Sequence, residues 1–246
     1  MKIKKIHFLN VSLFTTVLSL FFHTILYADN NSPASLYGYH GYLTTPSAYI
    51  ADGSWRFHYS YLPKGAGPFH KGKSDNWIFT SSLGLFPFME CFFSVYVSPE
   101  HEWEVSGRGD TTRSPGVKIK LFNEKKNIPA VSVGVFDPKV GLGDKSRSIA
   151  NVSSIFIVGS KKVGRSSISI GYGFNAFKST HARLSDVFGG IDVYFSHFLS
   201  LMVDYDGENL NEGLYAHWKG LNMSIAYVGE SIPAYRIGYN LNLNHR

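Results

Sequence analysis

Residues 114–174 read SPGVKIKLFNEKKNIPAVSVGVFDPKVGLGDKSRSIANVSSIFIVGSKKVGRSSISIGYGF, and three runs within them alternate between apolar and polar or small residues. The apolar members are Val117, Ile119 and Leu121, then Val131, Val133 and Val135, and finally Ile168, Ile170, Tyr172 and Phe174. Successive side chains of a strand point to opposite faces, so each run predicts a strand with one apolar face. Residues 154–162 predict a further strand that is more apolar throughout.

The same pattern extends over the rest of the chain. The expected strands are 55–61, 77–85, 89–97, 117–121, 131–135, 154–162, 168–174, 190–195, 199–206, 213–218, 221–229 and 234–243. Long connections at 62–76, 98–115, 137–153 and 175–189 alternate with short ones at 86–88, 123–129, 163–165, 196–198 and 219–220. Outer-membrane barrels show this alternation of short turns and longer loops. The sequence therefore predicts an all-β fold, an antiparallel up-and-down outer-membrane β-barrel of about twelve strands.

A soluble β-sandwich also buries one face of each strand and is the alternative fold. The last expected strand separates its two faces most clearly. Tyr235, Ile237, Tyr239, Leu241 and Leu243 alternate with Arg236, Gly238, Asn240, Asn242 and Asn244. In a membrane barrel the apolar set faces lipid and the polar set lines the lumen.

Particular residues along the chain resemble the YjbH family of bacterial outer-membrane proteins, which are associated with exopolysaccharide production. The matching positions are Lys118, Lys120, Glu124, Pro129, Gly134, Asp137, Gly141, Gly143, Ser160, Lys161, Gly171 and Gly173. The similarity extends to GYHGYLTTPSAYIADGSWRFHYSY and FPFMEC upstream, and to FGGIDVYF and LMVDYDG downstream. The resemblance implies a barrel that assists polysaccharide export or assembly. Known members are often longer, so this chain resembles a short, single-domain form.

The first 28 residues predict a cleaved signal peptide. Three lysines precede an apolar stretch from Phe8 to Tyr27, and Ala28 ends it before a polar segment. A membrane anchor is the competing interpretation, because about twenty mostly apolar residues can span a bilayer. Residues 29–53 are then a lead-in segment, a plug or a periplasmic extension, and residues 54–246 are the barrel domain.

Composition limits the partners. Cys91 is the single cysteine of the chain, so an intramolecular disulfide is impossible. Without the three signal lysines, 21 basic residues face 18 acidic ones, and this small excess does not favour nucleic acid. The expected partners are outer-membrane lipid, the polysaccharide and other envelope export proteins, and no cofactor is expected.

A polar lumen lining is the candidate site. The polar phase of the strands contains Arg56, His58, Lys118, Lys120, Asp204, Asp206 and Arg236. Basic groups in a confined lumen attract anions, as an acidic glycan requires. Alternatively, the same basic residues form salt bridges with Asp204 and Asp206.

No set of residues in the sequence has the spacing of a known catalytic or metal-binding motif. The acidic loop at 100–104 has no defined ligand spacing, and the serines and histidines lack a nucleophile-elbow or triad context. We therefore expect a non-enzymatic barrel that assists export of an extracellular polysaccharide. The alternatives are a soluble periplasmic or secreted sandwich that binds carbohydrate, and a barrel-embedded lipid-modifying enzyme.

Overall fold

The computed structural model describes residues 33–66, 75–98, 110–138, 153–175, 184–229 and 232–243. The expected signal peptide and the acidic loop at 100–104 lie outside these ranges. Among the residues that are described, no helix is long and apolar enough to cross a membrane.

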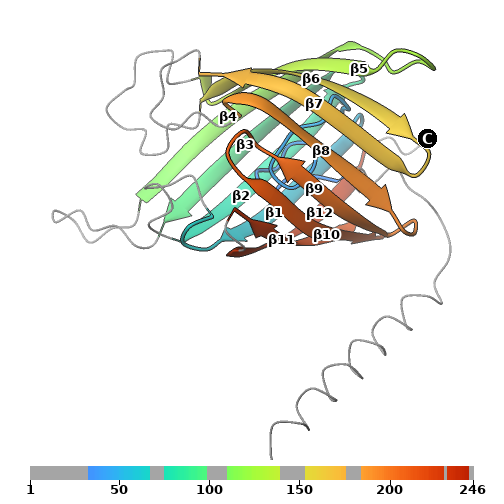
Figure 1. Ribbon diagram of the computed structural model, residues 1–246. Helices are drawn as coiled ribbons and strands as arrows, with labels where there is room; N and C mark the ends of the chain where they lie inside the picture. The colour runs from blue at the N-terminus through green and yellow to red at the C-terminus, as the bar shows by residue number, and fades with distance from the viewer. Residues whose placement is uncertain are drawn as a thin grey trace, which may run out of the picture. The chain divides into compact units, whose positions relative to one another are not determined.

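Twelve antiparallel strands close into a single barrel (Figure 1). They are β1 (Ser54–Leu62), β2 (Asn76–Phe86), β3 (Met89–Ser98), β4 (Asp110–Phe122), β5 (Ala130–Phe136), β6 (Ser154–Val163), β7 (Ser166–Phe174), β8 (Asp186–Tyr194), β9 (Leu199–Tyr205), β10 (Leu210–Trp218), β11 (Leu221–Val228) and β12 (Ile232–Asn242). Each strand pairs with the next along the chain, and β1 pairs with β12 from Ser54↔Asn242 to Tyr61↔Tyr235. The predicted twelve-stranded up-and-down barrel is confirmed.

Several strand starts and the loop pattern differ from expectation, and β4 and β8 differ most. β4 begins at Asp110 rather than 117, because its polar first residues pair with β3 through the backbone, from Ser98↔Asp110 to Ser94↔Ser114. β8 likewise begins at Asp186 rather than 190. At the end of the barrel where the loops are long, the last two connections, 206–209 and 229–231, are short. The alternation of loop lengths therefore holds for the first eight strands only.

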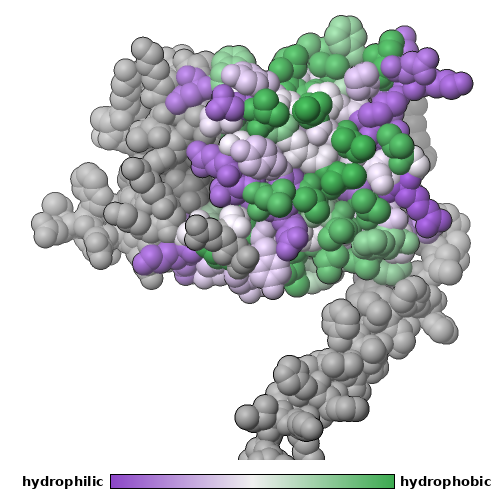
Figure 2. All heavy atoms as spheres, viewed as in Figure 1, coloured by the Kyte–Doolittle hydropathy of each residue, from purple (hydrophilic) through white to green (hydrophobic). Residues whose placement is uncertain are grey.

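The outer face of the barrel is apolar and the inner face is polar. In β11 every second residue is exposed, and these are Leu221, Met223, Ile225 and Tyr227, whereas Asn222 and Ser224 are buried. Figure 2 shows hydrophobic side chains spread over the outer face that this view presents. A water-soluble protein would bury those side chains, whereas a lipid bilayer solvates them. The soluble sandwich is therefore wrong, and the chain folds as an outer-membrane β-barrel.

Aromatic rings fill part of the lumen by lying over glycines of the adjacent strand. Three phenylalanines face glycines directly across the ladder, in the pairs Phe92↔Gly116, Phe156↔Gly134 and Phe188↔Gly171. A Cβ at any of these glycines would lie 2.1–2.3 Å from the ring, so no larger residue fits there. Tyr39 of the lead-in segment joins this cluster, with its ring centroid 4.8 Å from that of Phe136.

The lead-in segment lies inside the barrel. Every residue from Pro33 to Ala48 is buried, and the segment crosses the interior before β1 begins at Ser54 (Figure 1). Its side chains and backbone bind inward-facing residues of eight strands, β3, β4, β5, β6, β7, β9, β10 and β12. We call residues 33–51 the plug, and it positions the candidate site.

Candidate functional site

The plug is a compact loop whose turns require glycine. Gly38 has φ +90°, and a Cβ there would lie 1.8 Å from Thr80 Cγ2 of β2. At Gly41 a Cβ would lie 2.2 Å from the Thr45 carbonyl oxygen. Backbone hydrogen bonds from Leu36 N to Leu43 O and from Tyr42 N to Thr45 O close the loop. The loop therefore satisfies some of its backbone hydrogen-bonding groups internally and presents the remaining N–H and C=O groups to the barrel wall.

One carboxylate of the wall binds the centre of the plug. Asp204 of β9 accepts hydrogen bonds from the backbone nitrogens of Thr44 and Thr45, at 2.6 and 2.9 Å. Both threonine hydroxyls also donate to this carboxylate, at 2.9 and 3.1 Å. Asn211 of β10 donates to the same carboxylate and to the Thr44 hydroxyl. Five hydrogen-bond donors thus replace the water that the Asp204 carboxylate loses on burial.

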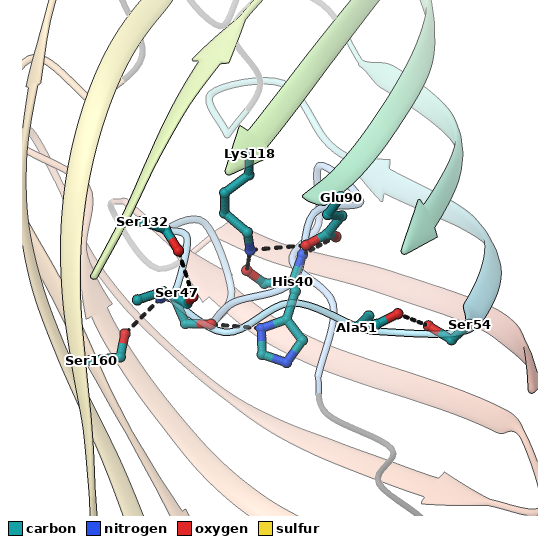
Figure 3. A network of polar contacts seen from close by, with 9 residues as sticks. His40, Ser47, Ala51, Ser54, Glu90, Lys118, Ser132 and Ser160 are labelled. Atoms are coloured by element: carbon teal, nitrogen blue, oxygen red, sulfur yellow. Dashed lines mark hydrogen bonds and ion pairs between the residues drawn. The ribbon is translucent and has the colours of Figure 1, made fainter. Parts of the chain in front are cut away.

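A second polar cluster fixes the plug on the side of β3 and β4 (Figure 3). Glu90 and Lys118 face each other across these strands, and their side chains form an ion pair at 2.9 Å with no exposure to solvent. Glu90 also accepts the backbone N–H of His40, and Lys118 donates to the His40 carbonyl at 3.0 Å. The ion pair therefore binds both backbone polar groups of His40.

Hydroxyl groups bind the plug on the remaining side of the wall. Ser160 accepts the Ala48 N–H at 2.7 Å, and Ser132 donates to the Ala48 carbonyl at 2.6 Å (Figure 3). Tyr42 Oη lies 2.7 Å from Ser169 Oγ. Its ring packs against Gly190, where a Cβ would lie 2.7 Å away. Each of these contacts uses a group that also hydrogen-bonds water or a sugar hydroxyl.

Tyr49 connects the end of the plug to the turn between β4 and β5. Its hydroxyl donates to Glu124 at 2.7 Å, and Lys161 lies 3.2 Å from the same carboxylate. Burial raises the pKa of the Glu124 carboxyl. Hydrogen bonds from Tyr49, the Lys162 backbone and Lys161 outweigh that effect, so the pKa lies below its ordinary value.

The structure places most of the expected lumen residues on the inner wall. The buried ones are Arg56, His58, Lys118, Asp204 and Arg236. Lys120 is half-buried, and Asp206 lies just past the end of β9, where its carboxylate accepts the backbone N–H groups of Glu208 and Asn209. These residues do not form one group, because Asp204 binds the centre of the plug, whereas Arg56 and Arg236 lie along the seam of β1 and β12, where Arg236 binds the start of the plug.

The expected salt bridges to Asp204 and Asp206 are wrong for Lys118. Its partner is Glu90, which sequence reasoning did not select. The plug residues His40, Thr44 and Thr45 were also missed. Their signal is the density of glycine, tyrosine and threonine in GYHGYLTT ahead of the first strand.

A serine–histidine pair occurs within the plug. His40 Nδ1 lies 2.6 Å from Ser47 Oγ, and both residues are buried (Figure 3). Burial lowers the pKa of His40 well below its ordinary value, and the positive charges of Lys118, Arg56 and Lys162 lower it further. His40 is therefore a neutral base at neutral pH. Its Nε2 has no hydrogen-bond partner among the described residues, so no carboxylate orients the ring as in a complete triad.

No protein-family model matches the chain, and no characterised protein matches it in sequence. Solved structures with a similar fold include the Salmonella typhi outer membrane phospholipase dimer with bound calcium. It is 9% identical over 77% of this chain and 89% of that one, with a TM-score of 0.41. Outer membrane phospholipase A from Escherichia coli is 9% identical over 78% of this chain and 96% of that one, with a TM-score of 0.40.

These comparisons correct one expectation. We expected the chain not to be an enzyme, and the two solved barrels just named are outer membrane phospholipases. The non-enzymatic interpretation is therefore withdrawn. The likeness at this identity and TM-score does not itself assign phospholipase activity to the chain.

Proposed function

We propose that the protein is a YjbH-like outer-membrane barrel that assists export or assembly of an extracellular polysaccharide, and that its plug closes the lumen until the glycan engages. The chemistry of the wall supports this role. Asp204 already binds two hydroxyl groups of the plug, and Ser169 binds a third through Tyr42. Sugar hydroxyls present the same donors and acceptors and compete for these groups when the plug moves.

The positions that carry the YjbH resemblance support the same proposal. Lys118 donates to the His40 carbonyl, Ser160 accepts from Ala48, and Glu124 accepts from Tyr49. Three residues far apart in the sequence thus bind one segment. The polysaccharide itself, an export system of partner proteins and secretion through a cleaved signal peptide come from the resemblance and the sequence, and they belong to the proposal.

The Asp204→Asn variant tests this role, because it removes the charge that binds both threonines while keeping the side-chain shape. We expect weaker plug binding, a higher ion conductance in planar bilayers and less surface polysaccharide, with unchanged heat-modifiable migration of the folded barrel. Asp206→Asn is the matched control, because Asp206 caps a turn and reaches the plug only through Asn211. A higher conductance with unchanged surface polysaccharide would leave a gated barrel without a glycan role.

A lipid-modifying enzyme is the second candidate, and the pairing of His40 with Ser47 favours it. A neutral histidine within hydrogen-bond distance of a serine is the minimal arrangement that activates a hydroxyl nucleophile. Both groups are buried, so a lipid reaches them only after the plug moves. Phospholipid hydrolysis in mixed micelles tests this role. The Ser47→Ala variant should abolish it, whereas Ser35→Ala, a change at another buried plug serine, should not. Equal hydrolysis by both variants would remove the pair from consideration.

A further inference from the structure

Three basic side chains lie along the inner face of the seam between β1 and β12. Arg56 faces Asn240, His58 faces Gly238, and Ser60 faces Arg236 in the register of these strands. Arg56 and Arg236 are each 2% exposed. They lie close enough to act on each other electrostatically. The seam therefore concentrates positive charge in a part of the lumen that excludes water.

Arg236 is bound on most sides. Its guanidinium donates to the Ala34 carbonyl at the start of the plug and, at 3.2 Å, to Ser224 of β11. It also lies over the Tyr215 ring, 5.3 Å from the ring centroid. Its Nη2 has no hydrogen-bond partner among the described residues. The two N–H donors of Nη2 therefore remain for a ligand.

Arg56 is buried, and the described residues give its guanidinium too few hydrogen-bond partners. Its Nε and Nη1 find no hydrogen-bond partner in the described part of the chain. Glu90 acts on Arg56 electrostatically, but its carboxylate pairs with Lys118 and accepts the His40 N–H. A buried guanidinium without a paired anion is strongly unfavourable, because the interior does not replace the lost hydration. The Glu90 carboxylate is shared with Lys118, so a further anion at Arg56 would stabilise the folded barrel.

The residues around Arg56 are small and polar. Ser82 of β2 faces Arg56 across the ladder, and Ser60 faces Arg236. The hydroxyls of both serines have no partner among the described residues. Gly238 contributes no side chain, and the His58 ring lies against it. Three guanidinium nitrogens without a hydrogen-bond partner among the described residues thus lie among hydroxyls and small residues, and Glu90 of β3 is the acidic group that acts on Arg56.

We propose that the inner wall at β1 and β12 binds an oxyanion, a phosphate or a carboxylate, with Arg56 as its main ligand and Arg236 as the second. A guanidinium presents its donors as a planar fork that matches the oxygens of these groups. The site goes beyond the proposed function, because it binds a free anion whether or not a glycan passes. Acidic sugars, lipid phosphates and inorganic phosphate share this chemistry.

Titration of the full-length folded protein in detergent with inorganic phosphate tests the site, with sodium chloride matching the ionic strength. We expect saturable binding of one phosphate per chain by calorimetry, together with a higher melting temperature. The Arg56→Met variant should lose both effects. Arg165→Met, which removes an exposed charge from the turn between β6 and β7, should keep them. Competition by glucuronate or by a phospholipid in mixed micelles then distinguishes a sugar carboxylate from a lipid phosphate.

The stability of the variants without phosphate gives an independent readout. Arg56→Met removes an unpaired buried charge and should melt no lower than the parent protein in phosphate-free buffer. Lys118→Met leaves Glu90 buried and unpaired and should melt lower in the same buffer. Absence of saturable phosphate binding by the parent protein, or an Arg56→Met variant that binds as the parent does, would overturn the proposal.

Discussion

Lys118 Nζ lies 2.9 Å from Glu90 Oε2 across the β3–β4 ladder, and neither side chain is exposed to solvent. Replacing Lys118 by methionine leaves a buried carboxylate without its cation. We expect this change to lower the free energy of unfolding by about 3–5 kcal/mol. Denaturant unfolding of the detergent-folded barrel measures the loss.

The double variant Lys118→Met with Glu90→Gln separates charge from packing. It removes both charges and retains an acceptor for the His40 N–H, so most of the lost stability should return. If the double variant is as unstable as the single one, the loss comes from packing and not from the unpaired charge.

Gly38 and Gly164 allow a matched test of the plug turn. Both have positive φ, +90° and +61°, but a Cβ at Gly164 meets nothing within 4 Å, whereas at Gly38 it meets Thr80. Gly164→Ala should therefore cost only the backbone strain, about 1 kcal/mol. Gly38→Ala should cost more and should expose the plug to added protease. Equal protease resistance in the two variants would show that the plug tolerates a side chain at residue 38.

Two positions of the last strand test the lipid-facing surface. Ile237 is exposed in the middle of β12, between Tyr59 of β1 and Met223 of β11, and Leu243 is exposed just past its end. Arginine at Ile237 should cost about 2–4 kcal/mol, and arginine at Leu243 should cost about 0–1 kcal/mol, because the penalty falls from the bilayer centre to its interface. Unfolding in lipid vesicles measures both, and equal costs would contradict a bilayer-depth effect.

Acidification should loosen the plug through His40. Its pKa in the folded protein lies well below 6.5, mainly because it is buried. The unfolded chain therefore binds this proton first, and the stabilising contribution is complete above about pH 6.5 and is lost as the pH falls below that value. Comparing unfolding midpoints at about pH 7.5 and about pH 5.5 measures the loss, which should be smaller for His40→Asn. An identical pH dependence in this variant would assign the loss to other groups.

Processing of the amino terminus follows from the sequence alone. The mature protein should begin near Asp29 and should fractionate with the outer membrane, because a basic, apolar and small-residue segment precedes that position. Mass spectrometry of the purified membrane fraction determines the first residue. An intact Met1 in the inner membrane would contradict this prediction.

The strands could be predicted because lipid and lumen impose opposite polarities on their two faces. β12 shows this directly, since Tyr235 and Ile237 are exposed while Arg236 is buried. The first residues of β4 could not be predicted, because Asp110–Ser114 pair through the backbone and carry no apolar alternation. The alternation of apolar residues in a sequence depends on the environment of the side chains and not on backbone hydrogen bonds. Polar strand ends therefore cannot be predicted from it.

The contacts of the plug could not be predicted from the sequence for a different reason. Thr44 and Asp204 lie 160 residues apart, and no local pattern relates them. Glu90 follows the turn at 86–88, and only the register that places it opposite Lys118 gives it a partner. Inward residues of each strand were therefore predictable from the alternation, while their partners depended on the closed barrel and on the plug.

The seam between β1 and β12 is also tied to the start of the plug. It is the one strand pair of the barrel without a connecting hairpin, and it is the natural place for a wall to part sideways. Eight residue pairs join the two strands, and Arg236 of β12 also holds Ala34, which lies ahead of β1 in the chain. Parting the seam would break both sets of bonds at once. Movement of the plug along the barrel axis would leave the β1–β12 pairs intact, so it would break fewer bonds than a lateral opening of the wall.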